Sequence, residues 1–149
     1  MQAASPSDVA FDPAAHGWTH EPEDGFLGLV GPIWMRRDAT GTRFGFVADR
    51  RHANLLGVVQ GGMMMTFADR GLGMLAWEAA DGRPSVTLSF DMQFMGPGRI
   101  GTFIELSGEA VRRTASFVFM RGLVTSGADA LAVCQGSWKV RFDPPARAV

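Results

Sequence analysis

The longest apolar stretch of the chain runs from Met63 to Ala80 and reads MMMTFADRGLGMLAWEAA. Its apolar residues fall on every side of a helical wheel, which is typical of a buried helix or a membrane-spanning one. At about 1.5 Å per residue the stretch is only just long enough to span a bilayer, and Asp69 and Arg70 stand in its middle. The pattern therefore predicts a buried core helix.

Strands are predicted before this helix. Residues 25–37 form a strand-like run that Gly31-Pro32 interrupts, which suggests an edge strand or a bent one. The DATG turn at 38–41 and the alternating run at 42–47 complete a hairpin. Residues 49–59 show no periodicity and are expected to form a connecting loop.

Four more strands are predicted after the helix, which Asp81-Gly82-Arg83-Pro84 brings to an end. They cover 85–95, 102–111, 115–124 and 130–142, and an Arg112-Arg113-Thr114 turn separates the second from the third. In the first of these strands, strict alternation predicts one apolar face and one polar face. The apolar face would hold Val86, Leu88, Phe90, Met92 and Phe94, and the polar face Thr87, Ser89, Asp91 and Gln93.

Consecutive strands joined by short turns form an antiparallel meander. The sequence thus predicts an α+β protein in which a curved antiparallel sheet of about six strands wraps round one long central helix. Gly71 and Gly73 lower the stability of that helix relative to alanine. We expect them to let the sheet approach the helix backbone closely.

Composition and charge narrow the picture. A chain of 149 residues fits one domain, here residues 25–143 after an irregular arm over 1–24. A net charge of −1 gives no electrostatic reason to expect nucleic acid. Cys134 is alone and the three histidines lack metal-ligand spacing, so no disulfide framework or metal site is expected. The N-terminus has no basic start and no apolar segment, which favours a cytoplasmic protein without membrane association.

The predicted helix carries the candidate chemistry. Gly61 and Gly62 stand at its start, where unpaired N–H groups and the positive end of the helix dipole can polarise a carbonyl. Asp69 lies two turns further in among apolar residues, where a charged carboxylate is costly unless it is paired, hydrogen-bonded or catalytic. The structural alternatives are a tight turn for the glycines and, for Asp69, an ion pair with Arg70 or with an arginine of a partner chain.

These residues form a pattern that resembles the hotdog-fold acyl-CoA thioesterases, in particular the branch involved in phenylacetate degradation. The resemblance covers about residues 25–142 and implies the hotdog fold. The matching positions are Asn54, Gly57, Gly61, Gly62, Asp69, Thr87 and the turn from Met95 to Gly101.

The resemblance implies a role for each matched residue. Asp69 would be the general base that activates water, or the nucleophile that attacks the thioester carbonyl. Gly61 would offer its backbone N–H to the carbonyl oxygen. Asn54 would help to bind the thioester or fix the loop, and Thr87 would orient the water. The resemblance also implies a homodimer or a dimer of dimers with sites between subunits, an acyl-CoA substrate, and no metal or organic cofactor.

Gln60 departs from the family pattern, which commonly has histidine near the thiol leaving group. Glutamine donates and accepts hydrogen bonds but does not exchange a proton near neutral pH. Gly62, Arg112 and Arg113 are candidate substrate-binding residues, the arginines for the phosphates of coenzyme A, although basic turns are commonly just solvated. His52 is expected to be a hydrogen-bonding loop residue rather than a catalyst.

The predicted function is hydrolysis of medium-chain or aromatic acyl-CoA thioesters. The alternatives are a non-catalytic acyl-CoA binding protein, a hydratase or dehydratase acting on acyl thioesters, and a structural oligomer without a ligand. A hydratase typically uses a histidine with a carboxylate, which neither His52 nor Gln60 supplies. The placement of Asp69 in the helix argues against a structural oligomer.

Overall fold

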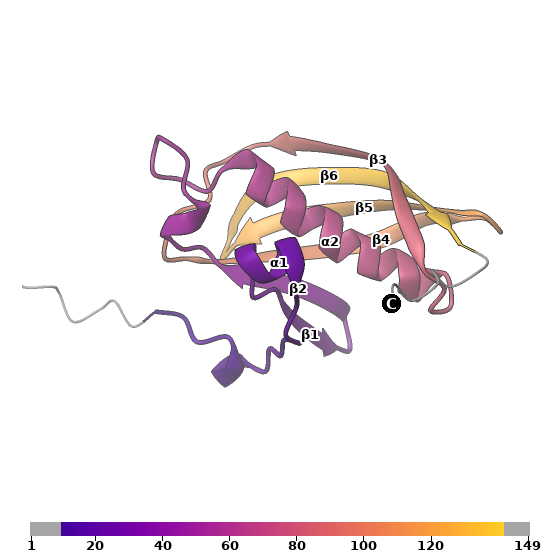
Figure 1. Ribbon diagram of the computed structural model, residues 1–149, viewed down its shortest axis with the longest axis horizontal. Helices are drawn as coiled ribbons and strands as arrows, with labels where there is room; N and C mark the ends of the chain where they lie inside the picture. The colour runs from indigo at the N-terminus through magenta and orange to yellow at the C-terminus, as the bar shows by residue number, and fades with distance from the viewer. Residues whose placement is uncertain (1–9, 142–149) are drawn as a thin grey trace, which may run out of the picture.

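In the computed structural model, which describes residues 10–141, one long helix packs against one antiparallel sheet (Figure 1). This arrangement is the hotdog fold, and it confirms the predicted fold class. The helices are α1 (Gly25–Val30) and α2 (Gly61–Ala79), with short 3-10 turns η1 (Ala14–His16) and η2 (Arg50–His52). The strands are β1 (Trp34–Asp38), β2 (Gly41–Val47), β3 (Ser85–Phe94), β4 (Phe103–Arg113), β5 (Phe117–Ser126) and β6 (Asp129–Val140).

The order of strands in the sheet is β1-β2-β4-β5-β6-β3. The predicted hairpin of β1 and β2 and the meander of β4, β5 and β6 are confirmed. The prediction that β3 continues into this meander is wrong, because β3 pairs with β6 at the far edge. The segment after β3 forms no tight hairpin. It passes the loop before α2, where Arg99 bridges Val58, and then enters the middle of the sheet.

The core lies between α2 and the inner face of the sheet. Phe67, Ala68 and Leu72 on α2 are fully buried, as are Ile104 and Leu106 on β4. Gly71 allows this packing, because a Cβ there would lie 2.3 Å from Leu106 Cδ2. The close approach expected at Gly71 is confirmed. The side of α2 away from the sheet is partly open, and Met65 there is 37% exposed.

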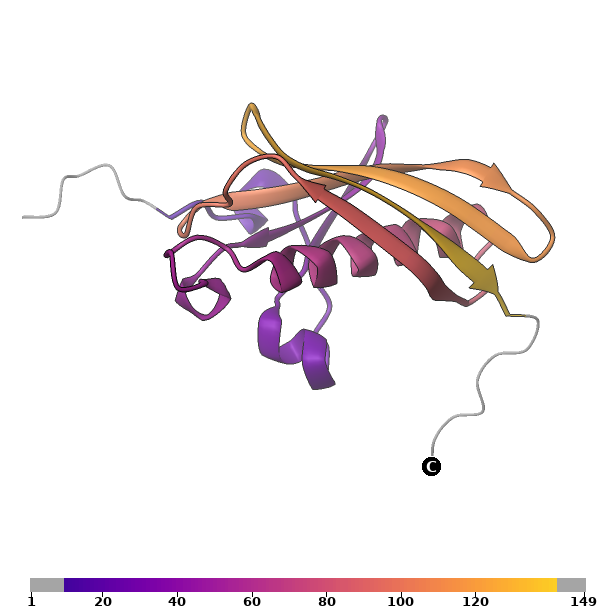
Figure 2. The ribbon, with the colours of Figure 1, turned by 90° about the horizontal axis from the view of Figure 1, so that it is seen from above.

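Residues 25–30 form the helix α1 where the sequence pattern predicted a strand. A short apolar run cannot be assigned to strand or helix from periodicity alone, and here tertiary contacts decide. Arg51 donates hydrogen bonds to the carbonyls of Leu29 and Gly31, and His52 donates one to the carbonyl of Val30. These bonds satisfy carbonyls at the end of α1 that would otherwise lack partners. Figure 2 shows α1 on the side of α2 opposite the sheet.

Part of the segment before α1 packs on the domain. Trp18 is buried beside Phe103 and under the guanidinium of Arg36, and Thr19 bridges Met35 on β1. Residues 1–9 of the predicted arm, and the last residues of the predicted domain, lie outside the described part of the chain. Within residues 10–141, no helix is long and apolar enough to cross a membrane.

Candidate active site

A β-bulge in β3 determines which of its side chains face α2. Thr87 pairs with Trp138 and Ser89 pairs with Ser137, so Leu88 is an extra residue on the β3 side. A bulge of this kind changes which face the next side chains occupy. Thr87 therefore points inward like Phe90, whereas Ser89 points to the outer face. The prediction that Thr87 and Ser89 share a face is wrong, because it assumed unbroken alternation.

The bulge brings Thr87 to Asp69. Thr87 Oγ1 donates a hydrogen bond of 2.7 Å to Asp69 Oδ1 across the gap between β3 and α2. Asp69 is partly exposed in the single chain, and within residues 10–141 its second carboxylate oxygen has no hydrogen-bond partner. Arg70 does not pair with Asp69. It binds Glu23 just before α1 at 2.5 Å, so the expected alternative of an ion pair between Asp69 and Arg70 is wrong.

The start of α2 presents two free backbone donors. Gln60 is the N-cap residue, and its Oε1 accepts a 3.0 Å hydrogen bond from the N–H of Met63. Gly61 and Gly62 are the first helical residues, and within residues 10–141 their N–H groups have no hydrogen-bond acceptor. Two such donors at the positive end of a helix dipole can bind a carbonyl oxygen or an oxyanion.

Asn54 fixes the loop that leads to α2. Its Oδ1 accepts hydrogen bonds from the N–H groups of Leu56 and Val58. Asn54 was expected either to bind the thioester or to fix the loop. Because its Oδ1 accepts two hydrogen bonds from the loop, these contacts support the second role. The loop in turn holds Gln60 in place, since the Gln60 N–H donates to the carbonyl of His52.

His52 is buried and both of its ring nitrogens are engaged. Nδ1 accepts from the N–H of Asp49 at 3.0 Å, and Nε2 donates to the Val30 carbonyl at 2.7 Å. This pair of bonds defines a neutral ring with its proton on Nε2. A histidine held in this way has no free nitrogen for catalysis. This agrees with the expected role of His52 as a hydrogen-bonding loop residue.

Asp69 and Gly61 of one chain do not meet. Asp69 follows Gly61 by eight positions on one helix, which at about 1.5 Å per residue separates them by roughly 12 Å. The carbon and oxygen of a carbonyl are only about 1.2 Å apart. One carbonyl therefore cannot bind Gly61 while water held by Asp69 of the same chain attacks it.

The two arginines proposed for the phosphates lie away from the start of α2. Both belong to β4 rather than to a turn. Arg113 binds Asp81 at 2.6 Å, beyond the opposite end of α2. The hydrogen bond from Arg113 lowers the pKa of Asp81 and raises the pKa of Arg113. Within the single chain the structure does not bring Arg112 or Arg113 to Gly61.

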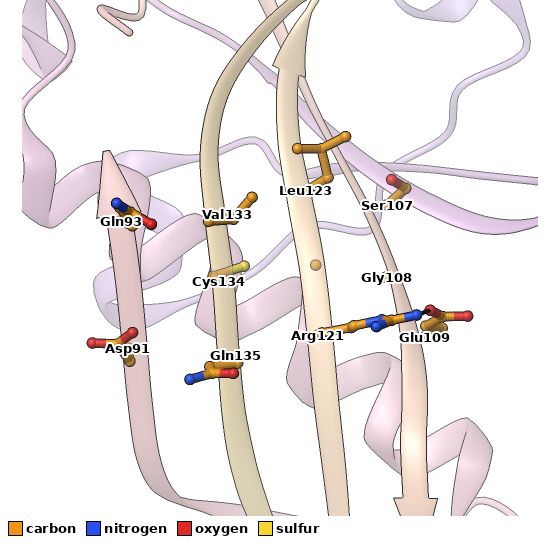
Figure 3. Close-up of a pocket in the computed structure, with 11 residues that line it drawn as sticks. Asp91, Gln93, Ser107, Gly108, Glu109, Arg121, Leu123, Val133, Cys134 and Gln135 are labelled. Carbon is orange, nitrogen blue, oxygen red and sulfur yellow. Dashed lines mark hydrogen bonds and ion pairs between the residues drawn. The ribbon is translucent and has the colours of Figure 1, made fainter. Parts of the chain in front are cut away.

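Two hollows flank these groups on different faces. One, of about 420 Å³, lies between α1 and the first turns of α2 and is bordered by Gln60, Gly62 and Thr66. The other, of about 580 Å³, lies on the outer face of the sheet, where Figure 3 shows Asp91, Arg121 and Gln135 on neighbouring strands. Arg121 pairs there with Glu109. The outer hollow is larger, but it contains none of the predicted catalytic residues, so the candidate chemistry belongs to the α2 side.

Sequence reasoning missed the hollow between α1 and α2, because it assigned residues 25–30 to a strand. No group of His, Cys, Asp and Glu residues that could hold a metal ion occurs among the described residues. Burial raises the pKa of the Cys134 thiol to about 11, so Cys134 is inert rather than nucleophilic.

Comparison with known proteins agrees with the fold. The model of the thioesterase superfamily matches residues 56–133. A proposed esterase of Pseudomonas aeruginosa is 32% identical over 114 residues, which make up 74% of this chain and 84% of the esterase.

Solved structures share the fold at lower identity. Thioesterase superfamily member 2 of zebrafish has a TM-score of 0.71 at 20% identity, over 80% of this chain and 88% of its own. A hypothetical thioesterase of Streptococcus pneumoniae, solved with coenzyme A, has a TM-score of 0.63 at 18% identity, over 66% of this chain and 79% of its own. A mutant of the phenylacetic acid degradation protein of Thermus thermophilus has a TM-score of 0.68 at 20% identity, over 79% of this chain and 100% of its own.

Proposed function

The chain belongs to the thioesterase superfamily and is a thioester hydrolase, and we propose that it hydrolyses acyl-CoA thioesters with medium-chain or aromatic acyl groups. The single observation that carries this proposal is the 2.7 Å hydrogen bond from Thr87 to Asp69. It fixes a carboxylate that sequence analysis had singled out, on the helix whose start carries two free N–H donors. The coenzyme A bound to the related streptococcal protein supports the choice of carrier.

Asp69 acts on the water. It accepts a proton while the water oxygen attacks the carbonyl carbon, and the hydroxyl of Thr87 keeps the carboxylate in one orientation. General-base catalysis by a positioned group contributes about 10²–10⁴ in rate. In the alternative route Asp69 attacks the carbonyl itself, and water then hydrolyses the acyl-enzyme anhydride.

The N–H groups of Gly61 and Gly62 hold the oxyanion that develops on the carbonyl oxygen. One such donor is worth about 3 kcal/mol in the transition state. The tetrahedral intermediate then collapses, the C–S bond breaks, and the thiolate takes up a proton. Thioester and water thus give acid and thiol. A thiolate leaves without strong acid assistance, so Gln60 is sufficient at the position where the family commonly has histidine.

The separation of roughly 12 Å between Gly61 and Asp69 along α2 supports a site built from two copies of the chain. β3 is an edge strand of the sheet, and Val86, Leu88 and Phe94 on it are exposed. Antiparallel pairing of two β3 edges would satisfy their backbone groups and cover these apolar side chains. It would also set the two α2 helices side by side, so that Asp69 of one copy faces Gly61 of the other. We propose a homodimer with two sites at this interface.

Thiol release from a panel of acyl-CoA esters tests the function, with short, medium, long, phenylacetyl and benzoyl groups and Asp69→Asn beside the wild type. We expect the substitution to lower kcat at least about a hundredfold. Asp91→Asn is the matched control, because Asp91 lies on the outer face of β3 and borders the outer hollow. The absence of thiol release from every ester, with CoA esters still bound, would favour the alternative of a non-catalytic acyl-CoA binding protein.

A further inference from the structure

The cavity between α1 and α2 has an apolar lining on both helices. Phe26 and Val30 border it from α1, and Met63 borders it from α2. Phe26 is 62% exposed, an unusual position for a large aromatic side chain unless something covers it. Such a lining favours an apolar ligand group.

Several polar side chains around this cavity already form hydrogen bonds within the protein. Arg51 donates to two carbonyls and to Asp49, and both nitrogens of His52 are bonded to backbone groups. Thr66 donates to the carbonyl of Gly62. These bonds hold Arg51, His52 and Thr66 in place, and an apolar group would leave them intact.

One wall of the cavity is the start of α2. Gln60 and Gly62 border it directly, and Gly62 carries one of the two free N–H groups. A group bound in the cavity would therefore lie next to the N–H of Gly62, where the thioester carbonyl would be polarised. Two arms of the substrate leave that carbonyl, the acyl chain and the pantetheine arm. The pantetheine arm carries amide groups that need hydrogen-bond partners, so the acyl chain fits the apolar lining better.

We propose that this cavity binds the acyl group of the substrate, and that Phe26 and Val30 on α1 set the size of the acyl group accepted. The proposal rests on the thioesterase function proposed above. A cavity of about 150 Å³ is enough for benzene in another protein, so about 420 Å³ has room for a phenyl ring or a chain of several methylenes. Phe26 and Val30 are thus specificity residues, and they take no part in the chemical step.

The test measures kcat/KM for acetyl-, butyryl-, hexanoyl-, octanoyl- and phenylacetyl-CoA in the wild type and three variants. We expect kcat/KM of the wild type to rise about fourfold per methylene until the cavity is full, which is the value of burying one CH₂. Val30→Phe fills the cavity and should lower kcat/KM for octanoyl-CoA at least about tenfold. The value for acetyl-CoA should stay within about twofold, because that acyl group is too small to reach residue 30.

Phe26→Ala removes an apolar wall and should flatten the dependence on chain length. Leu29→Ala is its matched control. Leu29 lies on the same short helix, is 71% exposed and does not line the cavity, so this variant should keep the wild-type profile. Circular dichroism and thermal melting confirm that each variant is folded. If Val30→Phe and Phe26→Ala each change kcat/KM by the same factor for every ester, or leave every ester unchanged, the acyl-binding proposal is wrong.

A binding measurement separates this proposal from the thioesterase function. Non-hydrolysable S-octyl-CoA and S-ethyl-CoA are titrated calorimetrically into the wild type and Val30→Phe. Tighter binding of the octyl compound that Val30→Phe abolishes supports the acyl-binding cavity even if no ester is hydrolysed. Equal affinity for both compounds in the wild type contradicts it even if esters are hydrolysed.

Discussion

Thr87 on β3 donates a 2.7 Å hydrogen bond to Asp69 on α2, and the extra residue Leu88 separates the inward-facing Thr87 from the outward-facing Ser89. With unbroken alternation, Thr87 would share the outer face with Ser89 and Asp91. β-Bulges are common next to active sites because they re-aim side chains in this way. The bulge therefore belongs to the proposed site as much as the two residues that it brings together.

Removal of the Thr87 hydroxyl should lower activity without unfolding the protein. We expect Thr87→Val to lower kcat about tenfold with little change in KM, because a hydrogen bond to a charged group is worth about 1.5–3 kcal/mol and water replaces part of it at this exposed position. Thr87→Ser should restore kcat. Ser89→Ala, which loses a bond to Ser137 on the outer face, serves as control. Full activity of Thr87→Val would contradict the positioning role.

Loss of the Gln60 side chain should affect stability more than chemistry. Gln60→Ala removes the N-cap acceptor for Met63, a loss of about 1 kcal/mol that corresponds to a drop in Tm of a few degrees. Gln60→Asn keeps an acceptor and should melt close to the wild type. Because the thiolate leaves without acid assistance, kcat of Gln60→Ala should fall less than tenfold. A loss as large as that of Asp69→Asn would assign Gln60 a direct part in the reaction.

Gly71→Ala should destabilise the protein although alanine favours helices by about 1 kcal/mol. The new Cβ would lie 2.3 Å from Leu106 Cδ2 and 3.2 Å from Phe44 Cδ2. Overpacking of this kind costs about 1–3 kcal/mol, so the free energy of unfolding in urea should fall. Gly73→Ala, where the nearest atom is Trp138 Nε1 at 3.3 Å, should change it less. A more stable Gly71→Ala would show that helix and sheet can move apart.

Cys134 should resist thiol reagents in the folded protein. Its pKa of about 11 leaves about one thiolate in a thousand at pH 8, and only the thiolate reacts. We expect no reaction with an aromatic disulfide reagent over the course of a thiol-release assay. One equivalent should react in guanidinium chloride. Rapid reaction of the native protein would mean that the strand around Cys134 opens.

The ion pair of Asp81 and Arg113 should stabilise the fold only above acidic pH. The pKa of Asp81 is lowered in the folded protein, so its contribution is complete above the unfolded value of about 3.9 and disappears as the pH falls through the folded value. The difference in Tm between the wild type and Asp81→Asn should be constant from pH 7 to 5 and should close below pH 4. Because the pair is exposed, 1 M salt should also reduce this difference in Tm. A difference that persists at pH 2 would contradict this assignment.

The sequence was sufficient for features that a periodic pattern encodes. The apolar run from Met63 to Ala80 and the alternating runs around it predicted α2 and the strands β2 to β6 to within a few residues. Gly61 and Gly62 before the run marked the start of the helix. These signals are local, since each depends on the spacing of side chains within one element.

Features that depend on contacts between distant segments could not be predicted. The crossover of β3 to the edge of the sheet leaves no trace in the short-range pattern. The bulge at Leu88 appears only when β3 is paired with β6. The helix α1 owes its form to Arg51 and His52, more than 20 positions later in the chain, so its sequence alone resembled a strand.

The attachment of α1 has a consequence for how the protein can change. Arg51 and His52 bind α1 through the backbone carbonyls of Leu29, Val30 and Gly31. Every amino acid carries the same carbonyl, so replacing side chains on α1 leaves these three bonds available. Mutations at positions 26 and 30 can therefore accumulate without detaching the helix. This segment is a suitable starting point for laboratory evolution or library design.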